Sequence, residues 1–326
     1  MALLGIETLV YGVDDLEACL KFYDDFGLQS VQRDEGGGAY RLAEGSSFVV
    51  RRGDDPRLPP AFLKGPGPRE VIWGVDSPAS LEAIAAELGR DREVRRDPDG
   101  ALHTIDDAGI NIGFRLFLRQ PLALEPAPPE NNLSDAPRWN RHRKWYERAQ
   151  PKLINHVVFG VPDVDRAVAF YVERLGMRVT DIMRGFGMFM RCDGRHDHHN
   201  LFLFRGGGRL FFSHVSFGVE TIDELMVGAM QMQRQGWTSE VGLGRHRISS
   251  LVFYYMNSPA GGQTEYSADS DYLDDRWTPR LWDQEFGQHH WLAVLPQEAR
   301  IAAAGVAEPL QNALPKLDDT ARARRA

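Results

Sequence analysis

The sequence lacks the features that define several classes of protein. It has only two cysteines in 326 residues, Cys19 and Cys192, which excludes a disulfide framework and favours a reducing, cytoplasmic compartment. Both are explained best as small buried apolar residues. No apolar run approaches the roughly 18 residues of a membrane-spanning helix. No basic region precedes the apolar stretch near the N-terminus, so a signal peptide is not predicted either.

Basic charge is also scarce. The chain has 38 Lys and Arg against 46 Asp and Glu, a formal net charge of −8. An acidic surface repels phosphate backbones, so no nucleic-acid partner is expected. What the chain does have is a hydrophobic content of 43%. That content and the chain length predict about two domains, each with a substantial core.

Four segments follow one plan, a strand and then a helix. In the clearest copy, 154–177, apolar residues recur at helical spacing, Asp163 is placed to cap the helix and Gly176 to end it. The other copies are 6–28, 69–89 and 213–236. Short alternating runs with Gly-rich turns come after the helices and are typical of strands. We predict an α+β fold of two domains, each a pair of βαβββ modules that form a curled, barrel-like mixed sheet.

A Pro-rich, polar stretch at about 119–150 separates the two pairs of modules. We therefore predict a first domain at 1–118, a linker at 119–150 and a second domain at 151–295. The Ala- and Arg-rich segment 296–326 is expected to be a peripheral tail. The chain is also expected to form a homo-oligomer.

The first chemical signal is a concentration of histidine: six of the ten lie between positions 156 and 246. His156 and His214 each precede a Gly-Val pair by four residues, in matching strands, and Glu265 follows a Gly-rich turn. One strand histidine is usually a core residue, but a matched pair is harder to dismiss. Two imidazoles and one carboxylate leave open positions on a metal, an arrangement suited to non-haem Fe(II), although the same ligands accept Mn(II).

The first pair of modules serves as an internal control. Its positions that correspond to His156 and His214 hold Thr8 and Glu70, and Gly113 stands at the position of Glu265. We therefore predict that the first domain has the fold without the metal ligands and is architectural.

Three further residues lie close to the predicted ligands along the chain, namely His199, His246 and Tyr255. The stretch GLGRHRISSLVFYYMNSPAGGQTEY (242–266) resembles the signature of the type I extradiol catechol dioxygenases, a family of the vicinal oxygen chelate superfamily. That signature is a His, nine residues to a Tyr, a Pro-x-Gly turn, and a Glu followed by an aromatic residue. The resemblance is specific in about 151–292 and only architectural in the first half.

The resemblance implies an oxidoreductase that inserts both atoms of O₂ into a catechol and opens its ring. It implies that the Fe(II) ligands are His156, His214 and Glu265. It also implies that an acid–base shell is formed by His199, His246 and Tyr255. A His-His-Thr/Ser pattern of the family corresponds to His198-His199-Asn200, which favours His199 as the catalytic residue and gives His198 and His196 lesser importance.

The substrate is less well defined. Ile248-Ser249 stands where the family often has a short polar pair, while the two-domain organisation resembles members that cleave aryl-substituted or polycyclic catechols, such as 2,3-dihydroxybiphenyl. Aromatic residues of the second half could line a pocket or belong to the core: Phe186, Phe189, Phe202, Phe204, Phe253, Trp237 and Trp282. Two alternatives stay open, a glyoxalase- or isomerase-like metalloenzyme of the same superfamily and a non-catalytic metabolite-binding protein.

Overall fold

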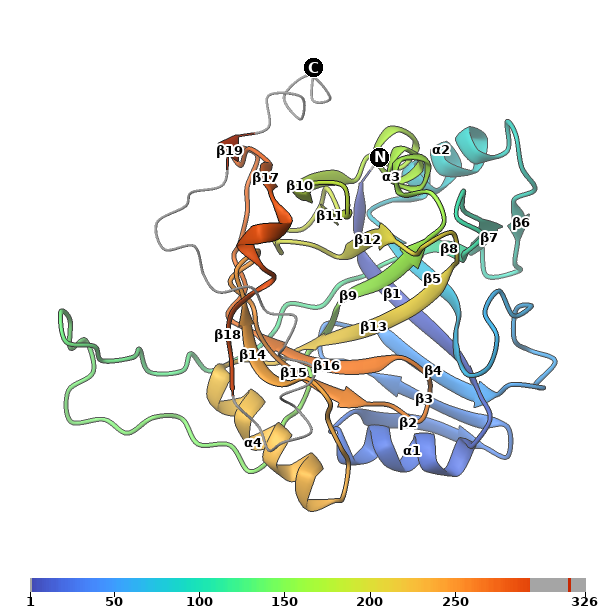
Figure 1. Cartoon of the computed structure of the whole chain (residues 1–326). Coiled ribbons are helices and arrows are strands. Elements are labelled where there is room, and N and C mark those ends of the chain that lie inside the picture. The colour runs from blue at the N-terminus through green and yellow to red at the C-terminus, as the bar shows by residue number, and fades with distance from the viewer. Residues whose placement is uncertain (1, 294–315, 318–326) are drawn as a thin grey trace.

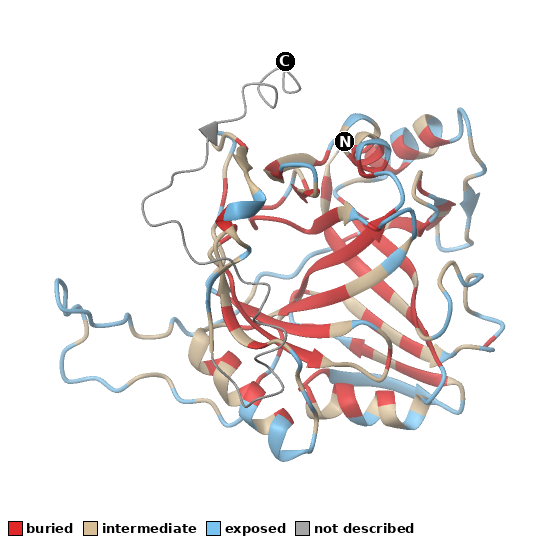
Figure 2. Cartoon of the chain, in the orientation of Figure 1, coloured by how far each residue is buried: buried red, intermediate tan, exposed pale blue. Residues whose placement is uncertain are grey.

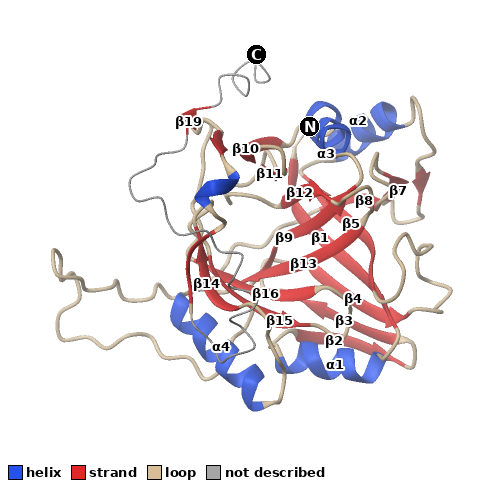
Figure 3. Ribbon diagram, in the orientation of Figure 1, coloured by secondary structure: helices blue, strands red, loops and turns tan. Residues whose placement is uncertain are grey.

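Two curved mixed sheets form the body of the protein (Figures 1 and 3). The computed structural model describes residues 2–293 and 316–317. The predicted tail, 296–326, therefore lies outside the described residues, apart from a two-residue strand at Lys316–Leu317. Among the described residues, no helix is long and apolar enough to cross a membrane.

The first sheet has eight strands in the order β2-β3-β4-β1-β5-β8-β7-β6. Its elements are β1 (Leu3–Val13), α1 (Leu16–Asp25), β2 (Gln29–Asp34), β3 (Gly37–Arg41), β4 (Ser47–Arg52), β5 (Gly67–Val75), α2 (Pro78–Leu88), β6 (Arg95–Arg96), β7 (Leu102–Ile105) and β8 (Asn111–Leu116). β1 and β5 pair antiparallel at the centre, while β1 with β4 and β5 with β8 are parallel. Each βαβββ module therefore contributes half of the sheet.

The second sheet repeats this plan and extends it to eleven strands, in the order β18-β14-β15-β16-β13-β9-β12-β11-β10-β17-β19. Its elements are β9 (Leu153–Val161), α3 (Val164–Ala169), η1 (Phe170–Arg174), β10 (Arg178–Met183), β11 (Gly187–Arg191), β12 (Leu201–Arg205), β13 (Phe211–Gly218), α4 (Ile222–Arg234), β14 (Gly242–His246), β15 (Val252–Asn257), β16 (Gln263–Ala268), β17 (Arg280–Trp282), η2 (Gln284–Phe286), β18 (His289–Leu292) and β19 (Lys316–Leu317). The predicted fold of four βαβββ modules in two curled sheets is confirmed.

Local sequence explains the start and end of the third module's helix. Asp163 accepts a hydrogen bond from the backbone N–H of Arg166, as predicted for the N-cap. The helix changes to a π-helical turn at Phe170–Arg174, and Gly176 follows with φ +73°, a left-handed conformation that glycine adopts without strain.

The two halves share one hydrophobic core. The rings of Phe26 and Tyr266 stack at 3.8 Å, and the Tyr266 hydroxyl donates to the Phe26 carbonyl oxygen at 2.7 Å. Buried residues of both sheets belong to one contiguous cluster, which Figure 2 shows as the red interior faces. Cys19 and Cys192 are buried within it and are not paired.

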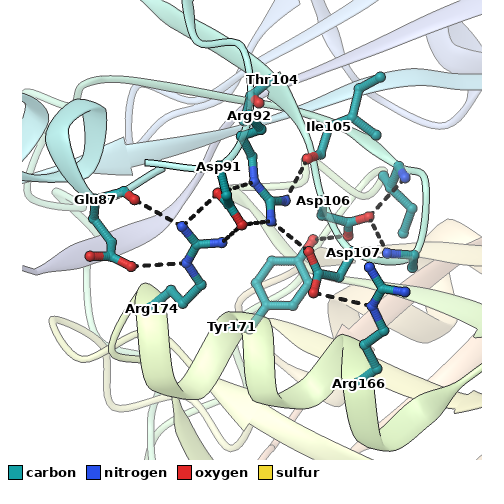
Figure 4. A network of polar contacts seen from close by, with 12 residues as sticks. Glu87, Asp91, Arg92, Thr104, Ile105, Asp106, Asp107, Arg166, Tyr171 and Arg174 are labelled. Carbon is teal, nitrogen blue, oxygen red and sulfur yellow. Dashed lines mark hydrogen bonds and ion pairs between the residues drawn. The ribbon is translucent and has the colours of Figure 1, made fainter. Parts of the chain in front are cut away.

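Polar contacts join the halves on another side, between α3–η1 and the loops beside α2 and β7 (Figure 4). Arg174 bridges Glu87 at 3.0 Å and Asp91 at 2.9 Å. The Tyr171 hydroxyl donates to the Asp106 carboxylate at 2.7 Å. Burial, only partly offset by the hydrogen bond from Tyr171, raises the pKa of Asp106 to about 6.

We expect Asp106→Asn to change the pH dependence of stability. Because the pKa of Asp106 is raised on folding, its stabilising contribution is complete below the unfolded pKa and is lost as the pH rises through about 6. The difference in unfolding free energy between wild type and Asp106→Asn should therefore shift by about 1.4 kcal/mol in favour of wild type from pH 8 to pH 5. Urea titrations at both pH values measure this difference, and a value independent of pH would contradict the assignment.

Candidate metal centre

Three adjacent strands bring His156, His214 and Glu265 together. β13 lies between β9 and β16, and Ser216 on β13 pairs with His156 on one side and with Glu265 on the other. His214 lies two residues from Ser216 along β13, so its side chain emerges on the same face of the sheet. The three side chains therefore converge on one point of the curved surface.

The donor atoms of these residues are close enough to share one ion. His156 Nε2 lies 3.2 Å from His214 Nε2 and 3.1 Å from Glu265 Oε2, and His214 Nε2 lies 3.7 Å from the same oxygen. Glu265 is fully buried, and neither of its oxygens accepts a hydrogen bond of good geometry, although His156 and Tyr255 lie beside the carboxylate. A buried carboxylate without donors is costly unless a cation compensates it, so these residues fit a divalent metal.

The protonation states of the site also suit a metal. Burial alone would raise the pKa of Glu265, but the neighbouring His156, His214 and His246 outweigh it and lower that pKa to about 2. Burial lowers the pKa of His214 to about 3, against the opposing effect of Glu265. At neutral pH the site thus offers an anionic carboxylate and a neutral imidazole, the forms in which these groups bind metals.

The turn before Glu265 depends on two glycines. Gly261 has φ +91°, and a Cβ there would lie 2.2 Å from the Pro66 carbonyl oxygen of the first half. Gly262 has φ +64°, and a Cβ there would lie 2.6 Å from the Phe212 ring. Only glycine fits this approach, which explains the Gly-rich turn in the sequence and ties β16 to the first half.

The structure also places His199, His246 and Tyr255 around this point. Tyr255 on β15 lies directly opposite Glu265, and its hydroxyl is 3.3 Å from His246 Nε2. The His199 ring lies 4.2 Å from the His156 ring, measured between centroids. These groups flank the cluster on two sides, with His199 beside His156 and with Tyr255 beside His214.

Burial keeps the flanking groups neutral. It lowers the pKa of His246 to about 4 and, with help from the neighbouring histidines, holds the pKa of His199 well below its usual value. Burial and Glu265 raise the pKa of Tyr255 well above its usual value. The site therefore presents two neutral imidazoles and a protonated phenol.

These residues border a cavity of about 250 Å³. The rest of its lining is largely apolar and aromatic: Val158, Met183, Phe186, Phe189, Phe202, Phe204, Val241 and Ile248. Phe189 and Phe202 stack at 3.9 Å, and Phe186 and Phe204 stack at 5.1 Å, so one wall is a continuous aromatic surface.

Three aromatic residues suggested for a pocket do not line this cavity. Trp237 packs edge-on against Phe22 of the first half, and Phe253 lies behind His246, 4.3 Å between ring centroids. Trp282 packs against the hydrophobic cluster that contains Phe189 and Phe202. Their placement depends on partners far away in sequence, which the local pattern does not contain.

His198 has two buried polar contacts in the structure that the sequence does not indicate. The residue is fully buried, and it lies between Asp181, 2.9 Å from its Nε2, and His199, 3.1 Å from its Nδ1. His196 instead lies against the backbone carbonyl of Leu273 at 2.9 Å. Nothing in the sequence near Asp181 signals this contact, because β10 and the loop before β12 meet only in the folded sheet.

The corresponding place in the first half holds a different set of residues. Gly113 pairs with Ile72 in the parallel β5–β8 pair, just as Glu265 pairs with Ser216. Glu70 is buried and contacts His103 Nδ1 at 2.7 Å. Within residues 2–293, His156, His214 and Glu265 are the one group whose ligand atoms gather as a metal would require.

Comparisons with known proteins agree with the resemblance found in the sequence. The model of the Glyoxalase/Bleomycin resistance protein/Dioxygenase superfamily matches residues 153–266. The chain is 32% identical over 308 residues to metapyrocatechase 2 of Cupriavidus necator, covering 91% of both chains. It is 27% identical over 143 residues to the biphenyl-2,3-diol 1,2-dioxygenase of Paraburkholderia xenovorans (strain LB400), covering 40% of this chain and 47% of the relative.

Solved structures share the whole fold. A halotolerant catechol dioxygenase superposes with a TM-score of 0.71 at 18% identity, covering 91% of this chain and 96% of the other. A Mn(II)-bound glyoxalase from Novosphingobium aromaticivorans superposes with a TM-score of 0.69 at 20% identity, covering 98% and 96%. At such low identity these likenesses describe the fold alone.

We expect the protein to bind one divalent metal ion per chain. Glu265→Gln should weaken metal binding more than about 100-fold, because this substitution removes the charged ligand. Glu70→Gln, at the counterpart of His214 in the first half, is the matched control and should bind metal like wild type. Anaerobic titration with Fe(II) and metal analysis of the dialysed protein measure the effect. Equal metal content in Glu265→Gln and wild type would contradict the assignment.

Proposed function

The chain belongs to the type I extradiol catechol dioxygenases of the glyoxalase, bleomycin resistance protein and dioxygenase superfamily, and we propose that it opens the ring of an uncharged aryl-substituted or polycyclic catechol at an Fe(II) ion held by His156, His214 and Glu265. The observation that carries this proposal is the convergence of these three donors inside a largely apolar aromatic cavity. The reaction breaks the ring bond beside the diol and inserts both atoms of O₂.

Fe(II) held by these residues would supply open coordination positions for both catechol oxygens and O₂, and a path for electrons between them. Two imidazoles and one carboxylate also accept Mn(II), so we propose Fe(II) as the working ion and keep Mn(II) as the alternative. The two free, buried cysteines agree with the reducing, cytoplasmic compartment that we propose for such an enzyme.

We assign catechol binding and deprotonation to His246 and Tyr255. The Tyr255 hydroxyl and His246 Nε2 lie 3.3 Å apart on the side of the cluster where the Tyr255 ring contacts His214. From there Tyr255 can hydrogen-bond a catechol oxygen, and His246 can take up the proton that this oxygen gives up as it becomes negatively charged. The imidazolium formed on His246 then lies beside the catecholate, so the two new charges are paired rather than isolated.

We assign the opposite side to His199. Its ring lies beside that of His156 and borders the cavity. A neutral imidazole there could take up the second catechol proton, and the resulting imidazolium would stabilise negative charge that develops on oxygen and then return that proton to the product.

The lining of the cavity supports an uncharged aromatic substrate. Among its residues, the polar side chains are five histidines, two serines, two glutamines and Tyr255, with no lysine or arginine. A carboxylate on the substrate would lose its water without gaining a cationic partner. The stacked Phe186–Phe204 and Phe189–Phe202 pairs offer flat surfaces to a second ring.

The decisive experiment follows O₂ uptake by anaerobically reconstituted Fe(II) protein with a panel of catechols. We expect one O₂ per ring cleaved, a yellow product, and a kcat/KM for 2,3-dihydroxybiphenyl at least about 10-fold above that for 3,4-dihydroxybenzoate. A metalloenzyme of the isomerase or glyoxalase type would take up no O₂, and a binding protein would bind catechols without turnover. Either result would overturn the proposed function.

A pair of variants tests the aromatic wall. Phe186→Ala should lower kcat/KM for 2,3-dihydroxybiphenyl by about 10-fold while changing the value for unsubstituted catechol little, because only the second ring loses a surface. Phe211→Ala is the matched control: its ring contacts Phe204 but does not border the cavity. Equal losses for both substrates would argue against the assigned subsite.

We also propose that the chain forms a homo-oligomer through the segment 119–150, which projects from the body as a long arm (Figure 1). The arm exposes Leu133, Trp139 and Trp145, the two tryptophans at 74% and 83%. Its base is held by ion pairs from Arg143 to Asp223 and from Lys144 to Glu220. Residues 138–148 carry five basic side chains and one acidic side chain on a chain of net charge −8, so a second copy of this chain offers complementary charge.

Replacement of both Trp139 and Trp145 by Ser should therefore reduce the oligomer to a smaller species. Light scattering after size exclusion measures the mass, and Met230→Ser, which removes another exposed apolar side chain from α4, is the control. An unchanged mass in the double variant would exclude the arm as the contact.

A further inference from the structure

We infer that Asp181 and His198 are positioning residues that set the tautomer of His199 through a buried chain of hydrogen bonds. The inference rests on the catalytic role proposed for His199. It begins from two contacts: Asp181 Oδ2 lies 2.9 Å from His198 Nε2, and His198 Nδ1 lies 3.1 Å from His199 Nδ1. Asp181 and His198 are 2% and 0% exposed, so water does not compete for these contacts.

Asp181 determines the first proton position. Its other oxygen, Oδ1, accepts from the Arg280 backbone N–H at 2.8 Å, so this carboxylate is held between β17 and His198. The Arg280 contact has this carboxylate acting as an acceptor, so in the proposed series of hydrogen bonds His198 carries its proton on Nε2 and donates it to Asp181.

The second proton position follows from the first. A neutral imidazole with its proton on Nε2 has a lone pair on Nδ1. His198 Nδ1 is then an acceptor, and the facing nitrogen of His199, also Nδ1, must donate. His199 is thereby held with its proton on Nδ1, which leaves Nε2, the nitrogen not engaged by His198, as a lone pair for the cavity that this ring borders.

Neighbouring side chains hold the rings of His198 and His199 in place. The Phe189 ring packs edge-on against both imidazoles, with centroids 5.6 Å from His198 and 5.0 Å from His199. Asn200 anchors the loop that carries them: its side chain accepts from the Cys192 N–H at 2.9 Å and donates to the Asn155 carbonyl at 3.0 Å. With both rings fixed, the tautomer depends on the hydrogen bonds rather than on ring rotation.

Asp181→Asn should reverse the direction of both hydrogen bonds in the series Asp181–His198–His199. The single oxygen of Asn would keep the Arg280 N–H, so its NH₂ group would face His198 Nε2 and donate to it. His198 would then carry its proton on Nδ1 and His199 on Nε2, which removes the lone pair from the cavity. We expect kcat to fall about 100-fold, in the range of a lost acid–base group, with little change in the anaerobic Kd for catechol.

A double-mutant cycle separates positioning from a merely structural effect. In the His199→Gln background, which has no tautomer to set, Asp181→Asn should change kcat less than about 3-fold. If Asp181→Asn costs the same factor in both backgrounds, the residue only supports the fold and the inference is wrong.

The tautomers can also be read without turnover. Long-range ¹H–¹⁵N spectra of the full-length, metal-free protein report which nitrogen of each ring carries the proton. We expect His199 to be protonated on Nδ1 in wild type and on Nε2 in Asp181→Asn. Asp197→Asn, which changes a neighbouring carboxylate that contacts Arg195 instead, should keep the wild-type pattern.

A wild-type His199 protonated on Nε2 would overturn the inference, even if Asp181→Asn did not fold. Failure of the proposed function would give a different result. Wild type would cleave no catechol, but the spectra would still show His199 protonated on Nδ1 in wild type and on Nε2 in Asp181→Asn.

Discussion

The structure of the site depends on one buried charge, the carboxylate of Glu265. It is fully buried, neither of its oxygens accepts a hydrogen bond of good geometry, and the polar side chains beside it are those of His156, His214 and Tyr255. In the folded protein such a charge is costly unless a cation balances it. The pairing of β16 with β13 and β15 and the glycine turn before it fix the position of this carboxylate beside the two imidazoles.

The internal duplication shows how little of this follows from the fold. Both sheets place a central antiparallel strand pair between two parallel neighbours, yet the first sheet pairs Glu70 with His103 at the corresponding place and has Gly113 where the second has Glu265. The module supplies converging strand positions, and the side chains at those positions decide whether a metal site results.

The first half nevertheless supports the site. Glu44 of the first half forms a buried ion pair with Arg195 at 3.0 Å, in the loop that presents His198 and His199. Pro66, also from the first half, closes over the Gly261 turn that leads to Glu265. Contacts from the first half thus support two segments next to the candidate metal centre, the loop with His198 and His199 and the turn before Glu265.

How much was predictable from sequence depends on the distance over which each interaction acts. Strand phase, capping residues and the matched spacing of His156 and His214 are local, so the sequence alone determined the four modules and grouped the candidate ligands. The environment of His198 is not local: Asp181 reaches it only because β10 and the loop before β12 meet in the folded sheet. Trp237 likewise packs against Phe22 across the two halves. Periodicity reports which face a side chain takes, but only the tertiary structure decides which distant residue meets it there, because that contact depends on how whole sheets pack.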